Sequence, residues 1–149
     1  MGQDKSKLAF GKVAKIILIV IIALILGAAI FTFFKIRVDA KAALRDAKNV
    51  RMALRSADIE MYGMSKTIYN PSRKNGLEEG VKEKVEKLFV PEGRYSITAY
   101  DAKEHELTGL TYRKDNYIVY FSKNGENIKW EVNYIFNVYT YDESDVITD

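Results

Sequence analysis

One uninterrupted apolar segment constrains this chain more than any other feature. Residues 16–34, IILIVIIALILGAAIFTFF, contain no charged residue, no proline and a single glycine. As a helix, a segment of this length spans roughly 28 Å, close to the thickness of the hydrocarbon core of a bilayer. Ile, Leu, Val and Phe each favour insertion, and no charged side chain opposes them. The segment therefore predicts a transmembrane helix.

A short basic leader, residues 1–15, precedes this segment and carries four Lys. A basic leader before an apolar block is typical of export or insertion by the secretory machinery. A cleavable secretory signal is the alternative, because Gly27 and Ala29 form a loose small-x-small arrangement. The apolar run is longer than the core of a signal peptide, which is about 7–15 residues, so the sequence favours retention as a single-pass anchor.

The segment that follows, residues 35–62, is charged and rich in Ala, and no turn signal separates it from the apolar block. The two segments are therefore predicted to form one continuous helix. Its apolar residues recur at alternating spacings of four and three, which is a heptad pattern. We call these residues the seam. Whether the seam packs on the chain's own C-terminal domain, on other copies of the chain, or on both stays open at this point. The seam consists of Ile36, Ala40, Ala43, Ala47, Val50, Leu54, Ala57 and Met61.

Residues 63–93 predict a loop followed by a short helix. Asn-Pro and Asn-Gly dipeptides mark the loop. Asn75, followed three residues later by Glu78, resembles a capping box that opens the helix.

Residues 94–141 predict a sheet, because apolar and polar residues alternate there with a period of two. Four runs form an antiparallel meander, and Asn124-Gly125 predicts a two-residue type I′ turn before the last strand. The tail, residues 142–149, is acidic. The expected sheet core consists of Ile97, Val119, Phe121, Ile128, Trp130, Val132, Tyr134 and Phe136.

These elements predict an α+β fold in which a long N-terminal transmembrane-plus-amphipathic helix packs on a four-strand antiparallel meander. The apolar face of the meander needs a cover, and the seam is the cover that the sequence offers.

Charge is distributed unevenly along the chain. Residues 1–55 carry eleven Lys and Arg against three Asp and Glu, whereas residues 56–149 carry twelve against seventeen. The basic excess lies beside the apolar segment, where anionic membrane lipid is favoured over nucleic acid as a partner. The acidic excess of residues 56–149 argues against nucleic-acid binding there. Because six Lys and Arg closely follow the apolar segment, the positive-inside count alone places the C-terminal domain in the cytoplasm.

No residue pattern in the chain predicts catalysis. There is no Cys, and the single His, His105, lies in the polar run DAKEHE without a second His or Cys to share a metal. No glycine-rich phosphate loop, metal-ligand spacing or nucleophile motif is present. We therefore expect a protein that is not an enzyme and has no catalytic residues, no cofactor and no metal site.

The order of these elements resembles that of type IV pilins and pilin-like pseudopilins: a basic leader, a Gly before a continuous apolar helix, its amphipathic extension, a variable loop and a four-strand meander. The run GLTYRKDNYIVYFSKNGENIKWEVNY also resembles the Tyr- and Thr-rich sheets of small pilin-like proteins from Gram-positive bacteria. The resemblance implies leader cleavage after Gly11, with Lys12 as the new N-terminus. The fifth mature residue, usually a Glu that pairs with a neighbour's terminal amine, is Ile16 here, so that charge pair is not expected.

The resemblance implies a membrane-anchored subunit of an extracellular filament or secretion pseudopilus, assembled with other pilin-like subunits through its N-terminal helix. It also implies an extracytoplasmic C-terminal domain, against the positive-inside count. If the seam carries assembly, Ala47→Glu should abolish it and leave the domain folded. The alternative is a single-span anchored binding or sensing module that does not polymerise. In that module exposed aromatic residues would engage a peptide or a sugar: Tyr100, Tyr120, Tyr139 and Tyr141.

Overall fold

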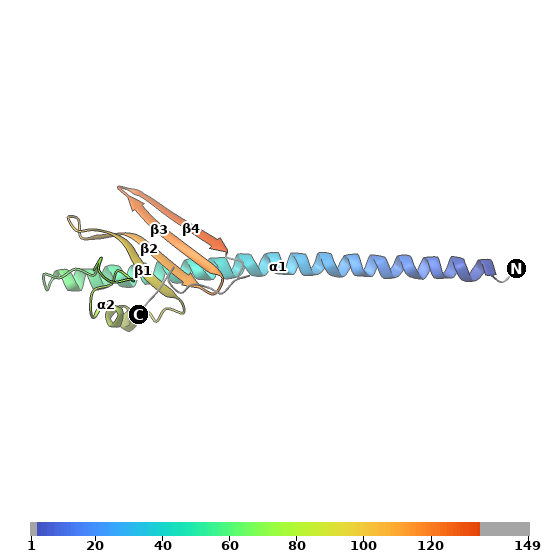
Figure 1. Cartoon of the computed structure of the whole chain (residues 1–149), viewed down its shortest axis with the longest axis horizontal. Coiled ribbons are helices and arrows are strands. Elements are labelled where there is room, and N and C mark those ends of the chain that lie inside the picture. Colours follow the sequence, from blue (N-terminus) through green and yellow to red (C-terminus); the bar gives the residue numbers. More distant parts are fainter. Residues whose placement is uncertain (1–2, 135–149) are drawn as a thin grey trace. The chain divides into compact units, whose positions relative to one another are not determined.

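The computed structural model describes the backbone of residues 3–134 and the side chains of residues 12–134. The chain divides into two compact units, Met1–Asp39 and Ala40–Asp149. One long helix followed by a short helix and four strands confirms the predicted α+β class (Figure 1). The elements are α1 (Gln3–Tyr62), α2 (Val81–Leu88), β1 (Arg94–Asp101), β2 (Glu106–Lys114), β3 (Tyr117–Asn124) and β4 (Asn127–Tyr134).

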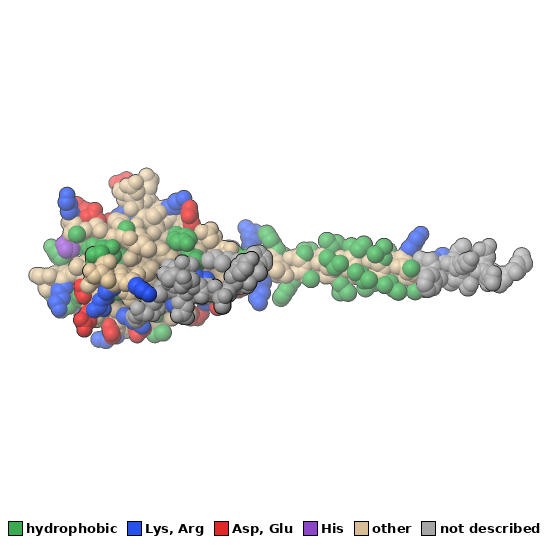
Figure 2. Space-filling model, viewed as in Figure 1, with side chains coloured by type: hydrophobic (Ala, Val, Ile, Leu, Met, Phe, Trp, Pro, Cys, Tyr) green, Lys and Arg blue, Asp and Glu red, His purple; other side chains and the backbone are tan. Residues whose placement is uncertain are grey.

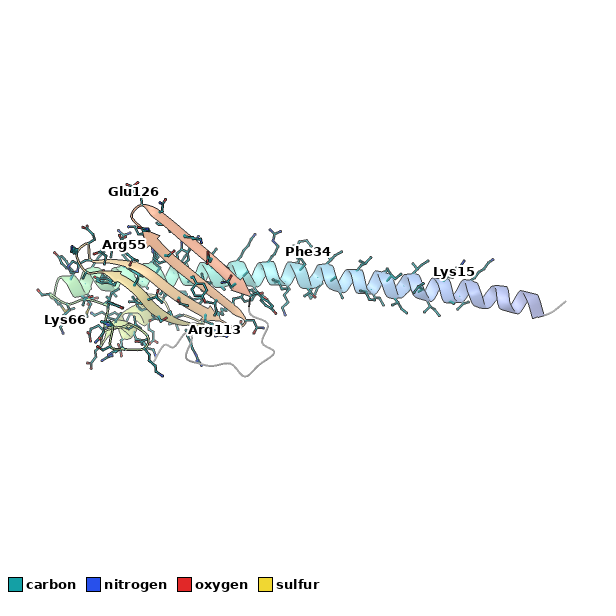
Figure 3. All side chains as sticks on the ribbon, turned by 45° about the horizontal axis from the view of Figure 1, so that its top comes forward. Lys15, Phe34, Arg55, Lys66, Arg113 and Glu126 are labelled. Atoms are coloured by element: carbon teal, nitrogen blue, oxygen red, sulfur yellow. The ribbon has the colours of Figure 1, made fainter. Side chains whose placement is uncertain are left out.

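The first unit is the N-terminal part of α1, and its apolar side chains are exposed. Ile16 is 62% exposed and Leu24 is 68% exposed. In Figure 2 hydrophobic side chains cover the visible face of this part of the helix, and Figure 3 labels Lys15 and Phe34, which lie at the ends of the apolar stretch. A surface helix of a water-soluble domain exposes a polar face instead. Among the described residues, one helix is long and apolar enough to cross a membrane, which is consistent with single-pass anchoring.

The second unit places the C-terminal part of α1 against the sheet. Six of the eight seam residues are buried there, at the spacing of four and three that keeps one face of a helix turned to a partner. The other two, Ile36 and Ala40, are half-buried. The buried six are Ala43, Ala47, Val50, Leu54, Ala57 and Met61.

The sheet is an antiparallel meander in the order β1-β2-β3-β4. Residues that lie directly opposite each other on paired strands share a face, so Tyr95, Tyr112 and Val119 are on one side of the sheet. Lys114 belongs to the same face of β2 as Tyr112, and its Nζ lies 3.0 Å from Oδ2 of Asp46 on α1. This face is therefore the one that α1 covers.

The core fills the space between α1 and the sheet, and the loop before α2 extends it. Tyr95 and Tyr112 of the sheet are fully buried opposite the seam, half of whose residues are Ala. The loop contacts the edge of β1 at one point, where the Ile97 amide donates a 2.8 Å hydrogen bond to the Asn75 carbonyl. The buried apolar residues outside α1 include Ile68, Leu77, Val81, Val85, Tyr95, Ile97, Leu110, Tyr112, Val119 and Phe121.

The expected sheet core is correct for β1 and β3 but wrong in part for β4. Ile97, Val119 and Phe121 are buried, whereas Ile128 is 51% exposed and Tyr134 is 38% exposed. Trp130 and Val132 are half-buried, and Phe136 lies outside the described residues.

The position of β4 at the end of the sheet explains this difference. Near β3 and β4, the helix α1 places two cationic side chains, and not the seam, against the sheet. Lys48 Nζ lies 5.8 Å from the centroid of the Trp130 ring. Arg51 Cζ lies 4.4 Å from the centroid of the Phe121 ring. Long cationic side chains cover an apolar surface with their stems but keep their charged ends hydrated. The outer strand is therefore only partly sealed.

Two local expectations also change. The β3–β4 loop is Gly125-Glu126, because Asn124 already pairs with Asn127, and only Gly125 has a positive φ, of 57°. That pattern fits a type II′ turn, which takes Gly at its first central position, better than type I′. The capping box is absent: α2 begins after Gly80, without a side-chain cap. Asn75 Oδ1 instead accepts a 3.0 Å hydrogen bond from the Leu77 amide, which forms a turn.

A residue other than glycine closes the C-terminal end of α1. Ser65 has a φ of 57°, and the Lys66 amide donates to the Met61 carbonyl at 3.0 Å. This bond is the long one of a Schellman-type cap, in which the left-handed position is usually Gly. Gly63, the residue that the sequence offers for this stop, lies two positions earlier and does not have a positive φ.

Candidate functional site

The exposed apolar part of α1 is the first candidate site, and it suits lipid or another apolar helix. No residue in the most apolar stretch of this helix is buried. The residues expected to flank a leader cleavage, Gly11 and Lys12, both lie within the helical span of α1, and Lys12 is exposed. Their place in the helix does not test cleavage.

The seam, in contrast, is occupied within the chain. Ala47 and Leu54 are 0% exposed, so neither is available to another copy while the domain is folded. Ala47→Glu would place a charge in the core, which costs several kcal/mol when the charge has no partner. The expectation that this variant spares the domain is therefore wrong, and a test of assembly must use other residues.

A cluster of polar and aromatic side chains lies at the C-terminal end of α1, and we call it the Tyr100 cluster. The Tyr100 hydroxyl donates a 2.8 Å hydrogen bond to Oδ1 of Asp58 and lies 3.4 Å from Nδ1 of His105. The His105 ring is 4.5 Å from the Tyr62 ring, and Tyr69 stacks on Tyr100 at 5.9 Å between centroids. Tyr100, expected to be exposed, is half-buried, while Tyr120 is 40% exposed. Tyr139 and Tyr141 lie outside the described residues.

The electrostatics of this cluster follow from its burial. Burial raises the pKa of Asp58, against the hydrogen bond from Tyr100, which lowers it. Burial and the hydrogen bond to Asp58 together raise the pKa of Tyr100 to about 12. The Tyr100 hydroxyl is therefore protonated at neutral pH and acts as a donor. Such a donor orients a carboxylate but supplies no nucleophile.

Two hollows share His105 in their lining. The arginine hollow, of about 270 Å³, is lined by Arg51, Arg55 and Asp58 of α1, by Glu104 and His105 of the β1–β2 connection and by Glu106 and Leu107 of β2. The tyrosine hollow, of about 590 Å³, is lined by Tyr62, Ser65, Lys66, Thr67, Tyr100 and His105. Figure 3 labels Arg55 on α1 and Lys66 in the loop that follows it. Among the described residues, no group of three His, Asp or Glu side chains could hold a metal ion.

Sequence reasoning missed this cluster because its members are far apart along the chain. Asp58 and Tyr100 are separated by 42 residues. One signal was available: Asp46 and Asp58 each adjoin a seam Ala, and acidic residues at the border of a buried helix face need partners. The structure supplies them, with Lys114 for Asp46 and Tyr100 for Asp58.

The arrangement of an apolar N-terminal helix with a four-strand antiparallel sheet is compatible with a pilin-like architecture. In comparisons with protein-family models, with curated proteins and with solved structures, none matches this chain.

Proposed function

We propose that this chain is a membrane-anchored, pilin-like structural subunit that assembles into an extracellular filament or a secretion pseudopilus. The observation that carries the proposal is α1 itself. Gln3–Tyr62 is helical without a break, its apolar part is exposed, and its last part is the core of a sheet domain. A subunit that waits in a bilayer and then packs laterally needs one helix with these two kinds of surface.

Burial of the seam supports placing the proposed assembly contacts on the apolar part of α1. The exposed residues there include small ones, Ala23, Gly27 and Ala28, which permit close approach of helices in an apolar environment. Because Ile16 replaces the family's acidic residue, the proposed contacts are apolar and do not depend on a charge pair with a terminal amine.

Paired cysteines test assembly, since the chain has no Cys of its own. Leu24→Cys with Phe31→Cys places two thiols on the exposed apolar part, where the side chains are 68% and 71% exposed. Oxidation of intact cells should give a ladder of covalent multimers in material sheared from the surface. A matched pair, Met52→Cys with Ile59→Cys, lies on the exposed side of α1 within the domain and should give no ladder.

Monomers and dimers alone, with no ladder and no sheared material, would rule out the filament. That outcome would leave the second candidate, a single-span anchored binding module. The two hollows beside His105 favour this candidate, since ligand sites are concave and combine aromatic surface with a few polar groups. Protease added to whole cells would show the side of the membrane on which the domain lies, because an extracytoplasmic domain is cleaved and a cytoplasmic one is protected.

A further inference from the structure

The arginine hollow brings two cations together on one face of α1. Arg51 and Arg55 are four residues apart, so their side chains lie one above the other on the helix. Two like charges at this spacing repel each other by a few tenths of a kcal/mol in an isolated helix. The repulsion between these two neighbouring charges therefore destabilises the fold, and an anion bound in the hollow would offset it.

Neither arginine forms a close ion pair within the described part of the chain. No ion pair of residues 12–134 includes Arg51 or Arg55. The Arg51 guanidinium is held over the Phe121 ring at 4.4 Å, and it is half-buried, whereas Arg55 is exposed. Burial, followed by repulsion from Arg55, lowers the pKa of Arg51, against the attraction of Glu106, which raises it. One cation thus packs on an aromatic ring, and the other is exposed to solvent.

Two of the three acidic residues of the hollow are already engaged. Glu106 forms an ion pair with Lys123, and Asp58 accepts the hydrogen bond of Tyr100. The third, Glu104, is exposed in the β1–β2 turn. The hollow therefore offers two guanidinium groups to an incoming anion, next to carboxylates that repel it more strongly as its charge increases.

We propose that the arginine hollow binds a carboxylate group of a ligand through Arg51 and Arg55. Guanidinium groups bind carboxylates with two parallel hydrogen bonds, and the site is wide enough for an acidic side chain or a chain end. A doubly charged phosphate meets twice the repulsion from Glu104 and Glu106 but also twice the attraction of the two arginines, so the titration below compares it directly with the carboxylates. This binding site goes beyond the proposed function and does not rest on it.

NMR titration of the full-length chain in detergent micelles tests the site. The probes are acetate, N-acetyl-glutamate amide and inorganic phosphate, each added at constant ionic strength with chloride as the balancing anion. We expect saturable shifts of the Arg51 and Arg55 side-chain Nε–Hε signals and of the His105 amide, with half-saturation in the millimolar range for both carboxylates. Stronger binding of the glutamate derivative than of acetate would identify a peptide side chain as the better source of the carboxylate, and the reverse a small molecule.

Two variants separate this site from general attraction of anions. Arg55→Gln should weaken acetate binding about tenfold or more, whereas Arg45→Gln, whose side chain is 76% exposed outside the hollow, should leave it within about twofold. Because Arg55 is exposed, Arg55→Gln should leave the unfolding temperature of the domain unchanged. Linear shifts without saturation, equal binding by the two variants, or tighter binding of phosphate than of acetate would each overturn the proposal.

Discussion

Leu54 is the position at which the role of α1 in the sheet domain is tested most sharply. Its side chain is 0% exposed within the seam. Leu54→Ala removes three buried carbon atoms, which corresponds to about 2.4 kcal/mol of lost transfer free energy at about 0.8 kcal/mol each. The cavity that remains raises the cost to about 3–4 kcal/mol. For a domain of this size each kcal/mol lowers the melting temperature by about 4–8 °C, so we expect a decrease of about 12 °C or more.

The assay is thermal unfolding of the full-length chain in micelles, followed by tryptophan fluorescence. The chain has a single Trp, and the Trp130 ring lies 4.8 Å from that of Phe121, so its emission reports on the sheet. Ile59→Ala is the matched control, because Ile59 lies on the same helix and is 68% exposed. It should change the free energy of unfolding by about 0.5 kcal/mol or less. If Leu54→Ala were as mild as this control, α1 would not be part of the domain's core.

Four further substitutions follow from local geometry, each measured by urea unfolding. Ser65→Gly should stabilise the domain by about 1 kcal/mol, because Gly adopts the left-handed conformation at the end of α1 without a steric cost; a loss of stability would contradict the cap. Tyr95→Phe should be neutral or stabilising, since the buried Tyr95 hydroxyl has no hydrogen-bond partner among the described residues, and a loss above about 1 kcal/mol would reveal one. Lys114→Met should cost about 3–5 kcal/mol, because it leaves the buried Asp46 carboxylate without its main partner; a loss below about 1 kcal/mol would argue against the pair. The pKa of Asp58 is raised above its ordinary 3.8, so the ionised carboxyl destabilises the fold above the raised pKa. Asp58→Asn should therefore gain stability relative to the parent chain as the pH rises from the ordinary 3.8 through the raised pKa, and a constant difference would refute the shift.

The fold could be predicted because its strongest signals are periodic. A spacing of four and three over the seam indicates a helix with one buried face, and alternation at Ile97, Val119 and Phe121 indicates strands with one buried face. Both periods are local properties, so they are readable without knowledge of the partner surface. They do not predict that the opposite face of the sheet is buried as well, at Ser96, Thr111, Arg113 and Ile118. Because the apolar face of the helix and that of the sheet must each be covered, the two are expected to pack on each other, which gives the α+β class.

The features that sequence reasoning missed depend on lateral position and on local geometry. The alternation of β4 is as regular as that of β3, yet Ile128 is exposed because β4 lies at the edge of the sheet, beyond the seam. Ser65 carries no sequence signal for a left-handed conformation, since Gly63 offers a better one. The Tyr100 cluster depends on the β1–β2 turn reaching the end of α1, and no periodic pattern encodes that contact.

We propose that α1 begins in lipid and ends as the core of a sheet domain. Because the chain has no Cys, single cysteines placed along residues 16–34 and at Met52 can each carry one spin label. In liposomes, we expect every label from residue 16 to residue 34 to be accessible to oxygen and shielded from a water-soluble nickel complex, with the label at Met52 exposed to the nickel complex. Exposure to the nickel complex at every third or fourth position of this segment would show a helix lying on the membrane surface and would contradict the claim.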